Sequence, residues 1–258
     1  PAYRRQGIGS ALIRGLEDFA RLDQRPKTVV YHGAVDLPGD KLVPPTGSGS
    51  VPADDTAVRF LLKHGYRLEQ VERMSRLPLP VPDLKSLLAA AIAETGPDYR
   101  LRFWIGPTPE QWRADVAVLG NRMSTDAPSA GLEEPEETWT VERVIAADER
   151  DKASPRTRFV AAAEHVPTGR LAGFTILSVP RQRERSVAQY ATLVLREHRG
   201  HRLGMLLKVA NLEQLERVAP GHPSVTTFNA EENRHMLSVN EALGFVPIAS
   251  EGAWRKDL

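Results

Sequence analysis

The 258-residue sequence predicts an α/β fold, and three observations support this prediction. Helical and strand patterns alternate along most of the chain. The segment 167–170 (Pro-Thr-Gly-Arg) joins two β-rich runs in the manner of a hairpin. One glycine-bearing loop that leads directly into a helical pattern occurs twice, about two hundred residues apart, which indicates two copies of one structural unit.

The overall composition is typical of a globular protein and excludes several classes of function. Hydrophobic residues make up 41% and charged residues 26%, and the net charge is only +1, so no strong field attracts nucleic acid or an anionic membrane. The absence of cysteine excludes disulfides, thiolate metal sites and a cysteine nucleophile. We expect a cytoplasmic protein with no nucleic-acid or membrane partner. The sequence leaves the oligomeric state open.

Propensity and turn signals predict the elements of each half in order. In the first half we expect a helix over 10–20, a strand over 27–34, a long loop over 36–52, a helix over 56–64 and one or two strands over 66–77. A proline-rich connector over 78–82 and a short helix over 84–94 lead to the second half. There we expect helices at 108–121, 138–148, 205–218 and 233–243, and strands at 100–105, 159–166, 171–179, 187–195, 224–229, 245–248 and around 254.

The repeated unit carries the strongest functional signal. The first copy of the loop spans 4–9 (Arg-Arg-Gln-Gly-Ile-Gly), and the second spans 198–204 (His-Arg-Gly-His-Arg-Leu-Gly). A turn of this kind directs free backbone N–H groups and the positive end of the helix dipole at one point, which suits an anion such as a pyrophosphate. Further along, each copy has a capped helix that ends in glycine and an aromatic residue, at Gly65-Tyr66 and at Gly244-Phe245.

These motifs resemble those of the GNAT superfamily of acyl-CoA-dependent N-acetyltransferases, in the tandem two-domain form. Arg4-x-x-Gly7-x-Gly9 matches the cofactor motif of the family completely, and Arg199-x-x-Arg202-x-Gly204 matches it with arginine in place of the inner glycine. The resemblance implies tandem GNAT domains with a central, mostly antiparallel mixed sheet flanked by helices. We expect a partial first domain over 1–80, apparently truncated at its N-terminus, a linker over 81–96 and a complete domain over 97–258.

The resemblance also implies a cofactor, a reaction and a set of site residues. The cofactor would be acetyl-CoA, with no metal, and a primary amine of a small molecule would attack the thioester directly. The residues expected to hold acetyl-CoA in the second half are Leu193, Val194, Leu195, Arg199, Gly200, His201, Arg202, Leu203, Gly204 and Asn233. The expected loop of the first copy consists of Arg4, Gly7 and Gly9, and the acidic rim of the acceptor site consists of Asp126, Glu133 and Glu134.

Two residues are candidates for catalysis, Asn240 and Tyr190. The family often places a tyrosine, the acid that protonates the leaving thiolate, seven residues after the asparagine that caps the second helix. Here that position is Asn240, whose amide cannot donate a proton near neutral pH. Tyr190 lies on the strand that leads to the loop. Two other functions stay open: a degenerate acyl-CoA-binding module and an unrelated nucleotide-binding α/β protein.

Overall fold

The computed structural model describes residues 5–35, 38–126, 128–133 and 135–258. Helices and strands alternate along these residues, as the sequence predicts. The α-helices are α1 (Ile8–Leu22), α2 (Thr56–Lys63), α3 (Leu84–Thr95), α4 (Arg113–Asp126), α5 (Val141–Lys152), α6 (Leu203–Val218) and α7 (Arg234–Ala242). The strands are β1 (Lys27–Ala34), β2 (Lys41–Leu42), β3 (Val51–Pro52), β4 (Arg67–Pro78), β5 (Tyr99–Ile105), β6 (Arg156–His165), β7 (Arg170–Pro180), β8 (Val187–Val194), β9 (Ser224–Ala230) and β10 (Val246–Asp257).

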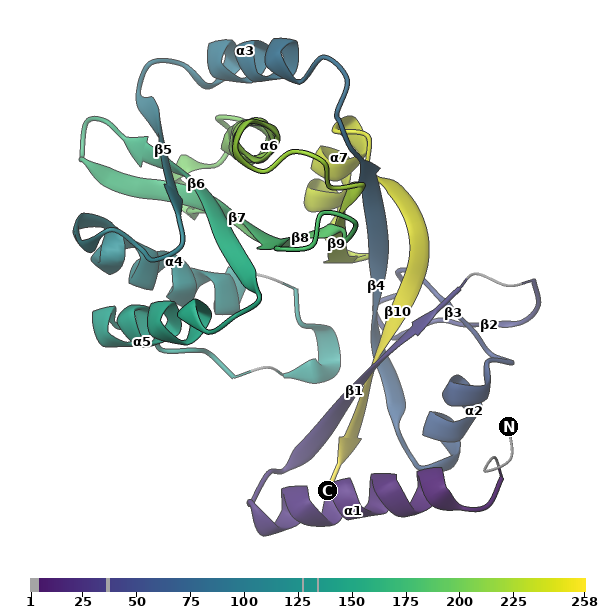
Figure 1. The fold of residues 1–258 in the computed structure, drawn as a ribbon. Helices are drawn as coiled ribbons and strands as arrows, with labels where there is room; N and C mark the ends of the chain where they lie inside the picture. The colour runs from purple at the N-terminus through teal and green to yellow at the C-terminus, as the bar shows by residue number, and fades with distance from the viewer. Residues whose placement is uncertain (1–4, 36–37, 127, 134) are drawn as a thin grey trace.

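One mixed sheet runs through the whole molecule. Its eight strands have the order β1-β10-β4-β9-β8-β7-β6-β5, and every neighbouring pair is antiparallel except β8 and β9. Helices α3 and α6 cover one face of the β5–β9 part, and α4 and α5 cover the other (Figure 1). The predicted fold class, a mostly antiparallel mixed sheet flanked by helices, is therefore confirmed.

The two halves of the chain exchange strands at the middle of this sheet. Strand β4 comes from the first half but lies between β9 and β10, and β10 comes from the second half but lies between β1 and β4 (Figure 1). Strand β1, the strand of the main sheet that precedes α2, thus pairs with β10, the last strand of the second half. Strand β9, which precedes α7, pairs with β4, the last strand of the first half. The described parts of 1–80 and 97–258 share one sheet, and most of 81–96 is α3, which packs against α6.

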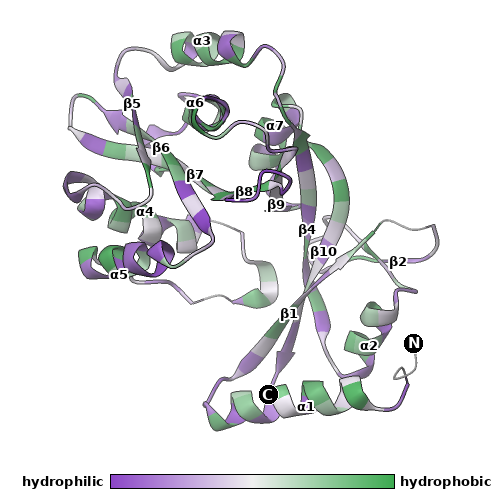
Figure 2. Ribbon diagram, in the orientation of Figure 1, coloured by the Kyte–Doolittle hydropathy of each residue, from purple (hydrophilic) through white to green (hydrophobic). Residues whose placement is uncertain are grey.

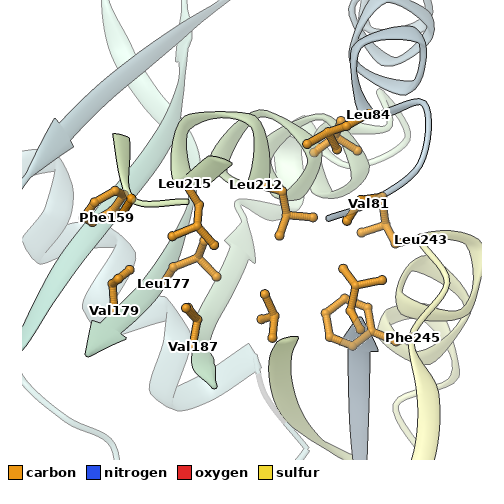
Figure 3. Close-up of a cluster of buried hydrophobic side chains, with 14 residues drawn as sticks. Val81, Leu84, Phe159, Leu177, Val179, Val187, Leu212, Leu215, Leu243 and Phe245 are labelled. Carbon is orange, nitrogen blue, oxygen red and sulfur yellow. The ribbon is translucent and has the colours of Figure 1, made fainter. Parts of the chain in front are cut away.

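The exchange places side chains of both halves in one core. Trp254, on β10, is fully buried in a cluster formed otherwise by the first half, including Val58, Tyr66 and Val71. A second cluster joins Leu77 and Val81 to the strands and helix of the second half (Figure 3). Because these cores are shared, each half depends on the other for burial of its apolar residues.

The helices that follow the two repeated loops differ in burial. Helix α6 buries ten residues against β6, β7, β8 and α3, whereas α1 buries only Ile13, Glu17 and Ala20. Apolar residues recur along α1 (Figure 2). Its exposed large apolar side chains are Ile8, Leu12, Leu16, Phe19 and Leu22. Among the described residues, α1 has no strands corresponding to β6 and β7 to cover this stripe.

Three sequence predictions need correction. Helix α4 does not begin at Thr108: the backbone N–H of Thr108 donates to Asp148 Oδ2 (2.9 Å), and a 3₁₀ turn (Glu110–Trp112) precedes the helix. The cap of α5 is Thr140, which accepts from the N–H of Arg143. The two predicted terminal strands are one strand, β10, since an irregularity in pairing after Pro247 lets the strand continue beyond the proline.

Candidate active site

Strands β8 and β9 form a wedge that opens toward the start of α6. They pair only at Val187↔Val225 and Ala188↔Thr226, and no pairing follows along the described part of either strand. The cluster that includes Leu177, Val187 and Leu212 packs at the closed end (Figure 3). A cavity of about 160 Å³ occupies the open end. Its lining includes Glu72 of β4, Tyr190 and Thr192 of β8, Lys208 of α6, Asn229 of β9 and Asn233 before α7.

A bulge in β8 directs Tyr190 out of the sheet. In the pairing with β7, Ile176 lies opposite Ala191 and Leu177 lies opposite Gln189, so Tyr190 is the extra residue and its side chain is 77% exposed. The Gln189 amide satisfies the disrupted ladder, since Nε2 donates to the carbonyls of Ile176 (2.9 Å) and Ala191 (3.0 Å). The structure thus places Tyr190 at the cavity and Gln189 as the residue that holds the bulge.

The second glycine-bearing loop forms an open cradle at the start of α6. The N–H groups of Met205 and Leu206 both donate to the Arg202 carbonyl, so the helical hydrogen bonds begin there and the N–H groups of Leu203 and Gly204 precede them. A Cβ atom added at Gly200 or Gly204 would meet nothing within 4 Å. The cradle therefore combines free backbone donors with space for an anion.

Arg202 has the backbone conformation that glycine adopts in the first copy. It precedes α6 with φ 54° and ψ 19°, and Gly7 precedes α1 with φ 80° and ψ −2°. The left-handed conformation costs an ordinary residue about 1–2 kcal/mol. The arginine therefore preserves the turn of the motif at the expense of stability.

We expect Arg202→Gly to raise the free energy of unfolding by about 1 kcal/mol, because glycine adopts the left-handed region without that cost. The lost ion pair with Glu94 (3.2 Å) joins two exposed side chains and offsets little of this gain. Urea denaturation measures the change. Arg199→Gly is the control, since φ is −74° there and glycine offers no relief. An Arg202→Gly protein less stable than wild type would contradict this account.

Arg199 connects the loop to the helix on the opposite face of the sheet. Its Nε donates to the carbonyl of Val194 (3.1 Å), and its guanidinium is paired with the Asp126 carboxylate. Asp126, predicted at the acceptor rim, thus lies beside the cofactor loop and neutralises Arg199.

The ring of His201 lies 5.3 Å from that of Tyr99, whose hydroxyl bonds to His198 Nδ1 (3.0 Å). Burial, followed by the neighbouring His165, lowers the pKa of His198.

The asparagines of α7 have separate roles. Asn233 caps the helix by accepting from the N–H of Met236 (3.3 Å), and it lines the cavity. Asn240 is 1% exposed, and its amide donates to Asn229 Oδ1 (2.7 Å). It is Asn229, not Asn240, that reaches the cavity. The structure therefore places Asn240 behind the site, where it orients Asn229.

Leu193, Val194 and Leu195 lie on or just after the end of β8, and the side chains of Leu193 and Leu195 are buried in the core. The N–H of Leu195 donates to the carbonyl of Ala172 on β7 (2.9 Å), so this donor is directed away from the wedge.

The remaining predicted residues lie apart from the cavity. Glu133 pairs with Arg255 (2.9 Å) and Lys27 (3.9 Å), and Arg255 holds its pKa below the usual range. Gly7 directly precedes α1, and Gly9 lies in the first turn of that helix. Glu134 and Arg4 lie outside the described residues.

Sequence reasoning missed two polar residues of α6. Asn211 is fully buried and its amide donates to the carbonyls of Phe159 (3.0 Å) and Thr175 (3.3 Å), which ties the helix to β6 and β7. Lys208 is 2% exposed and lines the cavity. A signal was present in the sequence, because both residues interrupt the apolar positions of a helix that is otherwise buried nearly all round.

Solved structures that share this architecture include the following three. Over its whole length the chain is similar to a tandem GNAT protein from the clavulanic acid biosynthesis pathway, with 29% identity, a TM-score of 0.76 and 72% of that chain covered. All of the chain also matches 70% of a GCN5-related N-acetyltransferase from Sphaerobacter thermophilus, with 16% identity and a TM-score of 0.62. A glucosamine N-acetyltransferase region of a fungal multi-domain GH3 β-N-acetylglucosaminidase has 16% identity and a TM-score of 0.59, with 99% of this chain and 28% of that one covered.

No protein-family model and no curated protein sequence matches the chain. The structural neighbours nevertheless confirm the fold that the motifs predicted, which is that of GNAT proteins in the tandem form. Two of these neighbours are described as N-acetyltransferases. No helix in the described part of the chain is both long and apolar enough to cross a membrane.

Proposed function

We propose that this protein is an acetyl-CoA-dependent N-acetyltransferase that acts on a primary amine of a small molecule. The wedge between β8 and β9, which opens beside the α6 cradle, is the observation that carries this proposal. The unpaired edge of β8 offers backbone groups to the amides of an extended pantetheine arm. The cradle offers N–H groups to a pyrophosphate, and Arg199 lies beside it.

The residues present fit acetyl-CoA, which supplies an activated acetyl group when bound. The backbone from Gly200 to Gly204 would hold the pyrophosphate, and β8 would orient the arm so that the thioester reaches the cavity. The N–H groups near Leu193 and Val194 would polarise the thioester carbonyl. The acceptor would enter from the α4 side, where Met123 and Glu72 line the cavity. Positioning of the two reactants is the main contribution of such a site.

A second candidate function is an acyl-CoA-binding module without turnover. Asn240 supports this candidate. It occupies the position where the family often has an acidic tyrosine, and its amide is buried and bonded to Asn229. Binding of acetyl-CoA is common to both candidates. Release of the CoA thiol separates them.

The experiment is to incubate the protein with acetyl-CoA and a panel of amino sugars, amino acids and polyamines, and to follow free thiol with a colorimetric reagent. Because the chain contains no cysteine, all thiol that appears comes from CoA. We expect thiol release with at least one amine and a matching acetylated product by mass spectrometry. Binding without release across the panel would favour the module.

A further inference from the structure

Lys208 is a buried lysine with no partner. It lies on the second turn of α6, is 2% exposed and lines the cavity. Among the described residues no carboxylate pairs with it and no acceptor receives a hydrogen bond from it. Its Nζ lies 5.8 Å from the centroid of the Phe245 ring, a cation–π arrangement.

Stability does not explain a lysine at this position. A buried ammonium is costly unless it is paired, and lysines are almost never fully buried without a partner. A leucine or methionine there would continue the apolar face of α6, which packs on β6, β7 and β8. The unpaired amine at the cavity therefore points to a role toward a ligand.

The surroundings of Lys208 favour the uncharged form of its amine. Burial alone lowers the pKa of Lys208 to about 7. The other titratable side chains that line the cavity are Glu72, from β4, and Tyr190, from β8. No charged group of the elements packed against α6 perturbs Lys208, since burial is the whole cause of the shift.

We propose that Lys208 is the proton carrier of acetyl transfer, the catalytic residue that takes a proton from the attacking amine and gives it to the sulfur of CoA. This inference rests on the proposed function. The C–N bond forms and the C–S bond breaks; the neutral Nζ accepts the proton that the amine loses, and the resulting ammonium donates it to the departing sulfur. The two transfers cancel, so the step needs no other proton source and no change of oxidation state.

The chemistry of the two partners suits a lysine of this kind. An amine that exchanges protons near neutral pH can act as base and then as acid in one turnover. A thiol ordinarily has a pKa of about 8.5, so its thiolate accepts a proton from such an ammonium. The amide of Asn240, at the position of the family's acid, has no proton to give.

The test uses CoA in place of acetyl-CoA. When CoA is bound, its thiol would occupy the place of the thioester sulfur. We would titrate the thiolate absorbance of CoA in complex with the wild-type protein and with Lys208→Met and Lys208→Arg. The chain has no cysteine to interfere. An ammonium beside the sulfur favours the thiolate. We expect about tenfold more thiolate at neutral pH in wild type than in Lys208→Met, and at least the wild-type fraction in Lys208→Arg, because arginine is always charged.

The outcomes separate this inference from the function on which it rests. A wild-type protein that binds CoA with the same thiol pKa as Lys208→Met would overturn the role of Lys208 and leave the proposed function standing. A wild-type protein that does not bind CoA would overturn both.

A second measurement needs no ligand. The folded-state pKa of Lys208 lies below its unfolded value of 10.5, so the unfolded chain binds more protons between about pH 7 and pH 10. The unfolding free energy of wild type, relative to Lys208→Met, should therefore rise as the pH rises through this window. A difference that does not change with pH would show that Lys208 is not held neutral, and it would overturn the proton-carrier role.

Discussion

Gly204→Phe is expected to weaken acetyl-CoA binding at least about 100-fold and to leave the fold intact. No atom lies within 4 Å of a Cβ at this position, so the larger side chain meets no protein atom near the backbone. It would instead fill the cradle and displace the pyrophosphate from its N–H donors. Two charge-assisted hydrogen bonds, each worth about 1.5–3 kcal/mol, account for at least this loss.

Calorimetric titration with acetyl-CoA measures the change, and thermal unfolding checks the fold. Gly15→Phe is a matched control, because Gly15 also lies in a helix, on α1, with nothing within 4 Å. It should bind acetyl-CoA like wild type. Unchanged affinity of Gly204→Phe would remove the cradle from the proposed site.

Trp254→Ala is expected to lower the free energy of unfolding by about 3–5 kcal/mol, the usual cost of truncating a buried tryptophan. The side chain is fully buried in a cluster with Tyr66, Leu68 and Val71 of the first half. Because β10 is the strand that the second half contributes between β1 and β4, the mutation removes a residue near the C-terminus from the core of the N-terminal half.

Urea denaturation followed by circular dichroism tests this. Phe103→Ala is the control: this aromatic residue lies on the edge strand β5 and is 43% exposed, so its loss should cost much less. Equal losses for the two variants would argue against the exchange of β4 and β10.

Local signals predicted nearly all the helices and strands, but they could not predict how the strands are paired. Periodicity and turn residues identified β1 over 27–34 and the hairpin of β6 and β7. Nothing in the local sequence of β4 or β10 shows that the two strands are neighbours, because strand pairing depends on contacts between residues far apart in the sequence. The proline at position 247 also predicts a break between two strands. In the structure the pairing of β10 with β4 is irregular after this proline, and the strand continues.

The candidate site was predicted where it depends on the backbone and missed where it depends on burial. The glycine pattern located the α6 cradle, and Arg202 keeps its left-handed turn despite the substitution. A lysine in a helix usually faces solvent, so its place among the apolar residues of α6 is the one sign in the sequence that Lys208 is buried. Likewise, the sequence places Asn240 among the candidates for catalysis, and only the fold shows that its amide is bonded to Asn229.

The most direct test of the central claim is an amide NMR titration of the wild-type protein with acetyl-CoA. If the β8–β9 wedge and the α6 cradle form the acetyl-CoA site, the N–H signals of Gly200, Gly204 and Thr192 should shift and saturate together at one equivalent per chain. Those of Gly7 and Gly9 should stay unchanged. Absence of shifts in the second loop, or shifts confined to the first, would contradict the claim.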